Sequence, residues 1–483
     1  MDKKVLVCIT TYNRMESLKR LVDGLLANTT ADIMIFDDHS TDGTSEYIDE
    51  CEMLDDFERL NALRQDEHRG KAGFWKTWQD IFDYCKAHEY DYYIFLQDDV
   101  EPCPDFVAKA IAAYDSIGDA VSLSPIRTNY TMYNGLSRWG ARPIERHEGY
   151  CVSHYFDCFG IVKRNFFEAL EWMIVPIAPC ADPFKSSGVG RQITRRLQDK
   201  GLKMCHVDRT LLAVSIDPTE SSMNKQERKR HPMLADWRDN EACVDIHMAS
   251  LWRDGHLLNT LATLCDMPET ATIFVTLNSY TQEQYNKTME GIKELRRQYG
   301  KSIVTRRAKN QKGSNEKLSQ LPKSTAPYIA FADDDLLYSH DYLLRLIHGL
   351  RLHDGAVSYH GSILNEFPTK RYYGGRRMFS FNATVEADAP VDLIGSGVAL
   401  IRREWFSAEE LKSLYADAPA VSMDDIILSC ALAQKGISRW VLEHPSGVIR
   451  IKDPKPEDCY VYDQFKNNDS AQVEYVNSHF KRG

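Results

Sequence analysis

The sequence predicts an α/β protein with two consecutive domains, each built on a mostly parallel sheet that helices flank on both faces. Three observations support this prediction. The chain has 483 residues, which is enough for two or three domains of ordinary size. Apolar, strand-like runs alternate with segments of helical periodicity. Features of the first half also recur in the second half, in the same order and at a nearly constant separation.

The first half begins with this alternation of strands and helices. Strands are predicted at residues 4–10, 31–38 and 90–97, and helices at residues 15–28 and 68–88. The strands are nearly continuous apolar runs, which is typical of parallel strands that are buried on both faces. In such a sheet the ligand lies beyond the carboxyl ends of the strands. We therefore expect the polar residues that follow the strands to form the functional site.

The second half repeats this plan in a more divergent form. Strands are predicted at residues 271–280 and 327–335, with a helix at residues 281–300 between them. Two later segments also pair across the halves: "FGIVKRNFF" with "VALIRREWF", and "ITRRLQDKG" with "LSCALAQKG". These pairs indicate an internal duplication. We predict domains at residues 1–265 and 266–483, joined by the linker "DMPET" after a helix around residues 240–265.

Charge and composition limit the function classes. The net charge is −11, and the whole acidic excess lies before residue 256. An acidic half does not suit non-specific nucleic-acid binding, which depends on neutralising phosphates. No apolar run approaches the roughly 18 residues that span a bilayer, and the start of the chain lacks the pattern of a signal peptide. The twelve cysteines include no C-x-x-C pair or other zinc-binding pattern. For a chain without a secretion signal we therefore expect a cytoplasmic protein with reduced thiols.

Polar clusters follow three of the predicted strands of the first half. They are Thr10 to Arg14, the pair Asp37 and Asp38, and Gln97 to Asp99. A hydroxyl-rich turn and carboxylates at one sheet edge can hold a nucleotide together with Mg²⁺ or Mn²⁺, which neutralises a diphosphate. Each cluster alone is also typical of a helix cap or a solvated turn. Their occurrence at successive strand ends favours the nucleotide site.

The motifs "CITTYNR", "IFDDHSTDGT" and "FLQDDVEP", in this order, resemble those of the family-2 glycosyltransferases of the GT-A fold. The resemblance covers both halves. It implies two tandem GT-A (Rossmann-like) domains that transfer a sugar from a nucleotide-sugar, usually with inversion. It also implies that the Thr11–Tyr12 turn and Asp38 bind the nucleotide, and that Asp99 ligates the metal with Asp98 beside it. Gln97 stands where the family has the first Asp of its metal motif.

An inverting transfer also needs a general base, which takes the proton of the acceptor hydroxyl. In the family this base is an acidic residue that begins a helix ending at a glycine. "SMDDIILSCALAQKG" places Asp424 and Asp425 at this position, and we expect Asp425 to be the base. Two acids there also suit the dipole of a helix N-terminus. The matching residues of the first half are Val189 and Gly190, and the nearest carboxylate there is Asp182.

The second half has three consecutive carboxylates, at Asp333 to Asp335, but no counterpart of "DDHS". When Thr10 is aligned with Thr276, the segment that leads to these carboxylates is about thirty residues shorter than in the first half. We expect Lys317, with Arg306 or Arg307, to contact the donor phosphates instead. His360 either faces the acceptor, ligates metal or is structural.

The candidate site residues fall into three groups. The catalytic candidates are Asp425, Asp424 and Asp182. The candidate metal ligands are Asp99, Asp335, His206 and His444. The candidates for binding the nucleotide-sugar are Thr10, Thr11, Tyr12, Arg14, Asp38, Lys71 and Asp98 in the first half, and Thr276, Tyr280, Lys317 and Asp333 in the second half.

The sequence therefore predicts a glycosyltransferase that uses a nucleotide-sugar, uridine-linked by expectation, and a divalent cation. Two different transfers in one chain is the first hypothesis, and one active domain beside a degenerate one is the second. A sugar nucleotidyltransferase is disfavoured because "ITTYNR" lacks the glycine-rich loop of that class. A non-catalytic glycan-binding scaffold is disfavoured because both carboxylate clusters remain. The acceptor is a carbohydrate or another hydroxyl-bearing molecule, including a modified nucleic-acid base, and the oligomeric state stays open.

Overall fold

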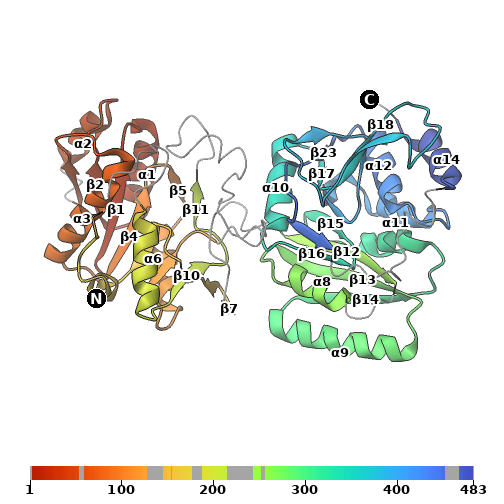
Figure 1. Cartoon of the computed structure of the whole chain (residues 1–483), viewed down its shortest axis with the longest axis horizontal. Helices are drawn as coiled ribbons and strands as arrows, with labels where there is room; N and C mark the ends of the chain where they lie inside the picture. Colours follow the sequence, from red (N-terminus) through yellow and green to blue (C-terminus); the bar gives the residue numbers. More distant parts are fainter. Residues whose placement is uncertain are drawn as a thin grey trace. The chain divides into compact units, whose positions relative to one another are not determined.

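The computed structural model describes residues 3–53, 59–127, 145–153, 155–176, 188–214, 243–251, 256–451 and 467–481. The described residues before 241 form one compact unit, unit 1, and those after it form a second, unit 2. Each unit has its own sheet and its own helices (Figure 1). None of the described helices combines the length and the apolar composition that crossing a bilayer requires.

Unit 1 has alternating strands and helices, as the sequence predicts. Its elements in chain order are β1 (Val5–Thr11), α1 (Met15–Asn28), β2 (Asp32–Asp37), α2 (Thr44–Met53), β3 (Leu60–Arg64), α3 (Gly70–Ala87), β4 (Tyr92–Gln97), β5 (Val100–Pro102), α4 (Phe106–Asp115), β6 (Ser122–Ser124), β7 (Glu145–His147), β8 (Tyr150–Val152), β9 (Gly160–Val162), α5 (Arg164–Ala169), α6 (Val189–Asp199), β10 (Met204–Val207) and β11 (Leu212–Val214). The main sheet has the order β3-β2-β1-β4-β9-β6-β10-β8-β7.

Unit 2 has the same kind of alternation. Its elements are β12 (Val244–Leu251), α8 (His256–Cys265), β13 (Thr270–Asn278), α9 (Gln282–Tyr299), β14 (Ser302–Ala308), η3 (Gly313–Lys323), β15 (Tyr328–Ala332), β16 (Leu336–Tyr338), α10 (Tyr342–His353), β17 (Ala356–Ser358), β18 (Gly361–Leu364), β19 (Arg376–Phe379), β20 (Ala389–Pro390), β21 (Leu393–Ile394), β22 (Val398–Arg402), η4 (Arg403–Trp405), α11 (Ala408–Ala416), α12 (Asp424–Gln434), β23 (Arg439–Val441), β24 (Ile449–Ile451) and α14 (Ser470–His479). The main sheet has the order β14-β13-β12-β15-β22-β17-β23-β20.

The two main sheets match strand for strand over their first seven strands, counted from β3 and from β14. In both, the first four strands run parallel. The fifth strand, β9 or β22, is antiparallel to both of its neighbours. This agreement confirms the predicted fold class of two tandem domains with mostly parallel sheets.

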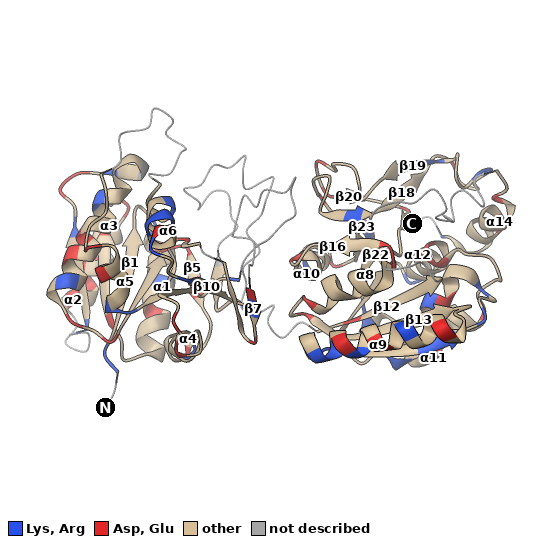
Figure 2. Ribbon diagram, turned by 60° about the horizontal axis from the view of Figure 1, so that its bottom comes forward, with Lys and Arg blue, Asp and Glu red and all other residues tan. Residues whose placement is uncertain are grey.

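The alternation of side chains along the strands gives each of the two main sheets two buried faces. On β1, Val7 and Ile9 belong to the core that α1, α2 and α4 cover, whereas Leu6 and Cys8 belong to the core under α3, α5 and α6. In unit 2 the corresponding cores lie under α8, α9 and α10 and under η3, α11 and α12. Charged side chains lie mainly on helices and loops, as α9 illustrates with charges of both signs (Figure 2). The strand ends are therefore where polar side chains can meet a ligand.

The predicted domain boundary after residue 265 is wrong, because unit 2 already includes strand β12. β12 lies in the middle of the second sheet, between β13 and β15, where a helix was predicted. Two polar residues, Asp245 and His247, interrupt its apolar pattern, yet both are buried. The Asp245 carboxylate accepts hydrogen bonds from the backbone N–H groups of Thr325 and Ala326, and the His247 ring lies 2.7 Å from the Ser324 hydroxyl. These hydrogen-bond partners allow a strand that the polarity of Asp245 and His247 alone would argue against.

The strand order also corrects the alignment of the two halves. β12, not β13, is the counterpart of β1, so Thr276 is not the counterpart of Thr10. The Thr11 hydroxyl donates to Asp98, which is 87 residues further along the chain. In unit 2 the Ser250 hydroxyl at the end of β12 donates to Asp334, 84 residues further along. The segments that lead to the two acidic clusters therefore have nearly equal lengths, and the predicted shortening of about thirty residues is wrong.

Candidate active site

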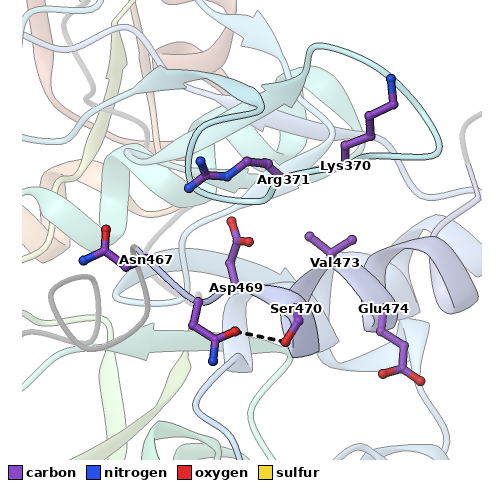
Figure 3. A pocket seen from close by; sticks show the side chains of 8 residues that line it. Lys370, Arg371, Asn467, Asp469, Ser470, Val473 and Glu474 are labelled. Atoms are coloured by element: carbon purple, nitrogen blue, oxygen red, sulfur yellow. Dashed lines mark hydrogen bonds between the residues drawn. The ribbon is translucent and has the colours of Figure 1, made fainter.

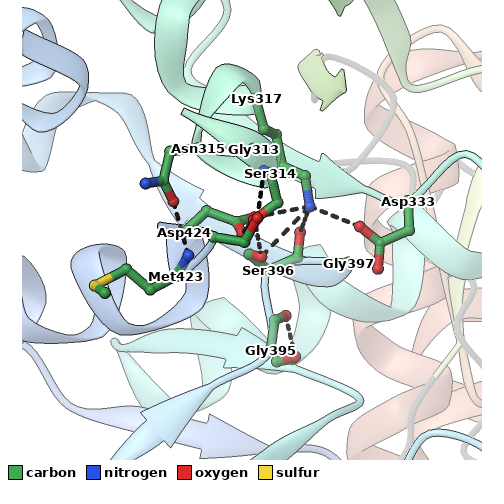
Figure 4. Close-up of polar contacts among 12 residues, drawn as sticks. Gly313, Ser314, Asn315, Lys317, Asp333, Gly395, Ser396, Gly397, Met423 and Asp424 are labelled. Carbon is green, nitrogen blue, oxygen red and sulfur yellow. Dashed lines mark hydrogen bonds and ion pairs between the residues drawn. The ribbon is translucent and has the colours of Figure 1, made fainter. Parts of the chain in front are cut away.

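A buried lysine connects two of the predicted acidic groups of unit 2. Lys317, on η3, is only 3% exposed. Its ammonium lies 2.7 Å from Asp333 at the end of β15 and 3.0 Å from Asp424 at the start of α12 (Figure 4). Burial alone would lower the pKa of Lys317, but the two carboxylates outweigh burial and raise that pKa above its usual value. The ammonium therefore stays charged at the sheet edge.

The two adjacent carboxylates that begin α12 have different surroundings. Burial pushes the pKa of Asp424 upward, but Lys317 and the hydroxyls of Ser314 and Ser396 outweigh this and hold the pKa below its usual value. For Asp425, burial and the charge of Asp424 raise the pKa above its usual value. Asp424 is thus a fixed anion of the network, and Asp425 is the more basic carboxylate of the pair.

Asp425 is held by Tyr372, in the segment between β18 and β19, and lies close to Arg376 at the start of β19. The stretch "KRYYGGRR" had suggested phosphate binding in the sequence, but not a contact with the predicted base. The hydroxyl of Tyr372 donates to Asp425 over 2.8 Å. The guanidinium of Arg376 lies 3.9 Å from the centre of the Tyr372 ring. Arg376 also lowers the pKa of Asp425, against the larger effect of burial. One aromatic hydroxyl and one cation therefore face the predicted base.

The C-terminal helix α14 anchors this segment. The carboxylate of Asp469 accepts hydrogen bonds from the backbone N–H groups of Tyr372 and Tyr373, over 2.8 and 2.9 Å. Asn477 makes two further hydrogen bonds to the backbone of Thr369. A cavity of about 330 Å³ opens beside these contacts, between Lys370 and Arg371 on one side and the start of α14 on the other (Figure 3). The position of Tyr372 thus depends on α14.

Small residues before β22 are required by close packing around the network. A Cβ atom on Gly397 would lie 1.9 Å from the Asp333 carboxylate, and one on Gly395 would lie 2.7 Å from the His360 ring. Between them, the Ser396 carbonyl oxygen accepts a hydrogen bond from Lys317 over 3.1 Å. Burial lowers the pKa of His360 to about 4, so this ring is neutral at pH 7. The sequence "GSG" is the signal that could have pointed to this turn.

In unit 1 the predicted acidic cluster is paired with an arginine. Arg14 lies 2.8 Å from Asp98 and 3.2 Å from Asp99, and all three side chains are largely buried. Asp98 also accepts hydrogen bonds from the Thr11 hydroxyl and the Tyr12 backbone N–H. Burial raises the pKa of Asp98 to about 6, against the opposing effect of Arg14. The structure thus brings Thr11, Tyr12, Arg14, Asp98 and Asp99 together, as predicted.

The predicted nucleotide residue Asp38 lies at the N-terminus of α3. Its two carboxylate oxygens accept the backbone N–H groups of Arg69 and Gly70, each over 2.8 Å. His68 lies 3.0 Å from the same carboxylate and stacks on Tyr12, with ring centres 3.8 Å apart. Tyr12 is 39% exposed, so an open aromatic pair stands beside Asp38. Thr10 is the second-last residue of β1, and Lys71 is the second residue of α3.

The remaining binding candidates of unit 2 lie on β13 or directly after it. The hydroxyl of Tyr280 is 2.8 Å from the hydroxyl of Ser250, so Tyr280 joins the Ser250–Asp334 contact. Thr276 contacts Ser319 on η3 instead, over 3.1 Å. Arg306 forms a 2.7 Å ion pair with Glu316. Ser250 was missed in the sequence because its strand was not recognised.

The metal candidates are not gathered into one site. His206 lies 2.6 Å from the Ser153 hydroxyl and 3.5 Å from Asp157, and the ring nitrogens of His444 face backbone carbonyl oxygens of Leu442 and Ser380. Asp335 follows the end of β15. Among the described residues, no three His, Cys, Asp or Glu side chains are arranged to hold a metal ion. Asp182 lies outside the described residues. The metal ligands therefore stay a prediction.

Comparison with known proteins gives one family match. The model of glycosyl transferase family 2 matches residues 6–169 and 257–408, which together are more than half of the chain. The first match begins within β1, whereas the second begins only after β12. None of the curated proteins matches the sequence.

Solved structures give further, weaker likenesses. GalNAc-T7 with UDP, GalNAc and Mn²⁺ is 17% identical over 42% of this chain and 42% of that chain, with a TM-score of 0.33. Residues 1–349 of TarS from S. aureus are 12% identical over 47% of this chain and 68% of that one, with a TM-score of 0.32. The mannosyltransferase PcManGT from Pyrobaculum calidifontis, in complex with GDP-Man and Mn²⁺, is 16% identical over 43% and 57%, with a TM-score of 0.28. UDP, GalNAc, GDP-Man and Mn²⁺ are ligands of those solved proteins.

Proposed function

Because the chain belongs to glycosyl transferase family 2, we propose that unit 2 transfers a sugar from a uridine-linked nucleotide-sugar to an acceptor hydroxyl, with inversion. The observation that carries this proposal is the pair of carboxylates that begins α12. Asp424 is fixed by Lys317, while its neighbour Asp425 has a raised pKa and no cation within ion-pairing distance among the described residues. A carboxylate that stays ionised in an ion pair and a second carboxylate suited to act as a base thus lie side by side at one sheet edge.

In the proposed reaction Asp425 is the general base. It takes the proton of the acceptor hydroxyl while the acceptor oxygen forms a bond to the anomeric carbon of the sugar. The bond from that carbon to the diphosphate breaks at the same time, and the nucleoside diphosphate leaves with the bonding electrons. The hydroxyl of Tyr372 keeps the Asp425 carboxylate in one orientation. Attack from the face opposite the diphosphate gives inversion.

The donor side of the site is proposed to lie along Asp333, Lys317 and Ser250. Lys317 supplies a buried positive charge beside Asp333, and its attraction to a diphosphate is strengthened by exclusion from water. The half-exposed Asp333 carboxylate is available to a hydroxyl of the nucleotide or the sugar. Ser250 orients Asp334 directly behind this cluster. The predicted contact of Lys317 with the donor phosphates is therefore kept as part of this proposal.

A divalent cation, Mn²⁺ or Mg²⁺, is the proposed cofactor of unit 2, with Asp335 as its ligand. The carboxylates of residues 333–335 are oxygen ligands of the kind that these ions prefer. Because the described residues bring no three such groups together, the donor diphosphate would have to complete the coordination. When bound, the ion would offset the charge of the leaving diphosphate. In unit 1 the residues do not fit an ion in the same way, because Arg14 already pairs with Asp98 and Asp99.

The acceptor stays a carbohydrate or another hydroxyl-bearing molecule, and a modified nucleic-acid base is included. A sugar nucleotidyltransferase would need a group that activates a phosphate for attack, and the pair Asp424 and Asp425 does not favour that chemistry. A non-catalytic scaffold would not need a carboxylate whose pKa is raised at the sheet edge. These two alternatives therefore rank below the transferase.

The test is sugar transfer by the full-length protein. The protein is incubated with uridine- and guanosine-diphosphate sugars, Mn²⁺ and candidate acceptors, and release of the nucleoside diphosphate is measured. Asp425→Asn should lower turnover by roughly a hundredfold or more, the usual scale for general-base loss, while donor binding by calorimetry persists. Asp354→Asn, an exposed carboxylate at the end of α10, is the matched control and should keep full turnover. Full turnover in Asp425→Asn would refute the assignment of the base.

A further inference from the structure

We infer that unit 1 binds a nucleotide but transfers no sugar, so that the chain carries one transfer site and one silent nucleotide site. The inference rests on the proposed function of unit 2. It follows from a comparison of equivalent positions in the two units, which the shared strand order makes possible. In unit 1 the positions of Lys317, Asp424 and Asp425 are occupied by apolar residues or glycine.

The helices α6 and α12 define the equivalent of the proposed base. Both helices have 11 residues, and both lead into a strand that pairs in parallel with its neighbour. Each is followed by a glycine with positive φ, Gly201 at 68° and Gly436 at 71°. Val189, the first residue of α6, therefore stands for Asp424, and Gly190 stands for Asp425.

Unit 1 has no room for a carboxylate at the position of the base. A Cβ atom on Gly190 would lie 2.9 Å from the carbonyl oxygen of Phe156 and 3.1 Å from the sulfur of Cys158. Cys158 is only partly exposed, and burial raises the pKa of its thiol, so it stays neutral. Val189 is 2% exposed and belongs to the same apolar core as Phe156 and Trp78. Close packing thus occupies the space that unit 2 leaves for a catalytic side chain.

The buried lysine is also lost in unit 1. The helices α3 and η3 both begin at a glycine with positive φ, Gly70 at 59° and Gly313 at 58°. Four residues further along, unit 2 has Lys317 and unit 1 has Phe74. Phe74 packs edge-on against Trp78, with ring centres 6.5 Å apart. Unit 1 therefore has no counterpart of either residue of the Lys317–Asp424 ion pair. Because both charges are replaced, neither of these two positions holds a buried charge without its counter-charge.

The groups suited to a nucleotide remain in unit 1. Tyr12 and His68 form an exposed aromatic stack on which a base can lie, and the Asp38 carboxylate beside it can accept hydrogen bonds. Arg14 supplies a positive charge next to this surface, and its guanidinium is held by Asp98 and Asp99. An aromatic surface, an acceptor and a cation together suit a nucleoside diphosphate. Within its described residues, unit 1 thus keeps a binding surface, while the positions of Lys317, Asp424 and Asp425 carry no equivalent group.

One further carboxylate of unit 1 lies near the strand ends, but it is already engaged. Asp157 accepts hydrogen bonds from the Ser124 hydroxyl over 2.8 Å and from the Phe159 backbone N–H over 3.2 Å. His206 lies 3.5 Å from the same carboxylate. These contacts fix Asp157 as part of the fold.

Any transfer that unit 1 does carry out would survive the removal of Asp425, which makes that variant the appropriate background for the test.

The experiment uses the full-length Asp425→Asn variant and measures two quantities. Sugar transfer is measured with the donor that the native protein uses, and binding of UDP is measured by calorimetry. We expect transfer to fall by roughly a hundredfold or more, with two UDP molecules bound per chain. Adding Tyr12→Ala should reduce binding to one UDP per chain. The matched control is Tyr150→Ala, which removes a comparable stack on His147, with ring centres 4.7 Å apart, at the opposite end of the sheet.

Two results would overturn the inference. One is transfer that survives Asp425→Asn and disappears when Tyr12→Ala is added, because unit 1 would then be an active transferase. The other is a single UDP per chain whose binding does not respond to Tyr12→Ala. If transfer survives both changes, the assignment of Asp425 in unit 2 has failed, and the UDP titration still decides separately whether unit 1 binds a nucleotide.

Discussion

Replacing Tyr372 with phenylalanine should move the acid limb of the pH profile of transfer to higher pH. The Tyr372 hydroxyl donates to Asp425 over 2.8 Å, and this hydrogen bond favours the ionised carboxylate. Burial and the charge of Asp424 raise the pKa of Asp425, while Arg376 and the Tyr372 hydroxyl lower it. Removing the hydroxyl takes away one of the two main contributions that lower the pKa of Asp425. The pKa of Asp425 therefore rises further.

The size of this shift follows from the energy of one hydrogen bond. A hydrogen bond to a charged group contributes about 1.5–3 kcal/mol. Since one pKa unit corresponds to about 1.4 kcal/mol, the pKa of Asp425 should rise by about one to two units in Tyr372→Phe. Only the ionised carboxylate can accept the proton of the acceptor, so turnover at low pH falls. At a pH well above the new pKa, turnover recovers to within a few-fold of the native protein.

The assay is kcat/KM for transfer as a function of pH in the full-length protein. Tyr475→Phe is the matched control, because its ring stacks on His479 in α14 and its hydroxyl has no hydrogen bond to Asp425. The acid limb of this control should coincide with that of the native protein. If the acid limb of Tyr372→Phe stays within about 0.3 pH units of the native one, the pairing of Tyr372 with an essential Asp425 is refuted, because the expected shift is several times larger.

Three further predictions concern stability. Lys317→Met leaves Asp424 buried without its counter-charge, so the free energy of unfolding should fall by about 3 kcal/mol. Lys317→Arg keeps a positive charge and should reduce the free energy of unfolding less. Urea denaturation measures both variants, and equal losses would contradict the ion pair. Ser250→Ala removes the donor to Asp334 and should cost about 1–3 kcal/mol by the same measurement, with no change contradicting the contact. Gly190→Ala should lower the free energy of unfolding by about 1–3 kcal/mol through overpacking. Gly24 lies inside α1 with open space around it, so Gly24→Ala should be neutral or stabilising. Thermal melts compare the two variants, and equal effects would refute the crowding at Gly190.

Apolar periodicity was sufficient to predict most of the fold. β1, β4, β13 and β15 are largely apolar runs, and parallel strands buried on both faces have this pattern. β12 was missed because Asp245 and His247 interrupt such a run, and their partners lie about 80 residues away in the chain. Sequence periodicity carries no information about a partner at that distance. The missed strand then displaced the boundary and the alignment of the two halves.

Site residues could be predicted where they belong to a recognisable sequence motif. Carboxylates at strand ends and at the start of α12 could be identified from spacing, and the structure places Asp333 and Asp424 on the same lysine. Tyr372 and Ser396 could not be assigned to the site in this way. The sequence "GSG" marks a tight turn at Ser396, but no local pattern ties that turn or Tyr372 to α12. Their positions follow from tertiary contacts, namely those of α14 for Tyr372 and the close packing of "GSG" for Ser396.

The buried polar residues of β12 also have a consequence for how the chain folds. Two sheets with the same strand order in one chain create a hazard, because a strand of one could be exchanged for its counterpart in the other. If β12 paired with β4 in place of β15, the Asp245 carboxylate would lose the N–H donors of Thr325 and Ala326, which directly precede β15. A buried carboxylate without partners is strongly unfavourable, so the exchanged pairing is rejected. The feature that hides β12 from pattern recognition therefore also ensures that it pairs with the correct sheet.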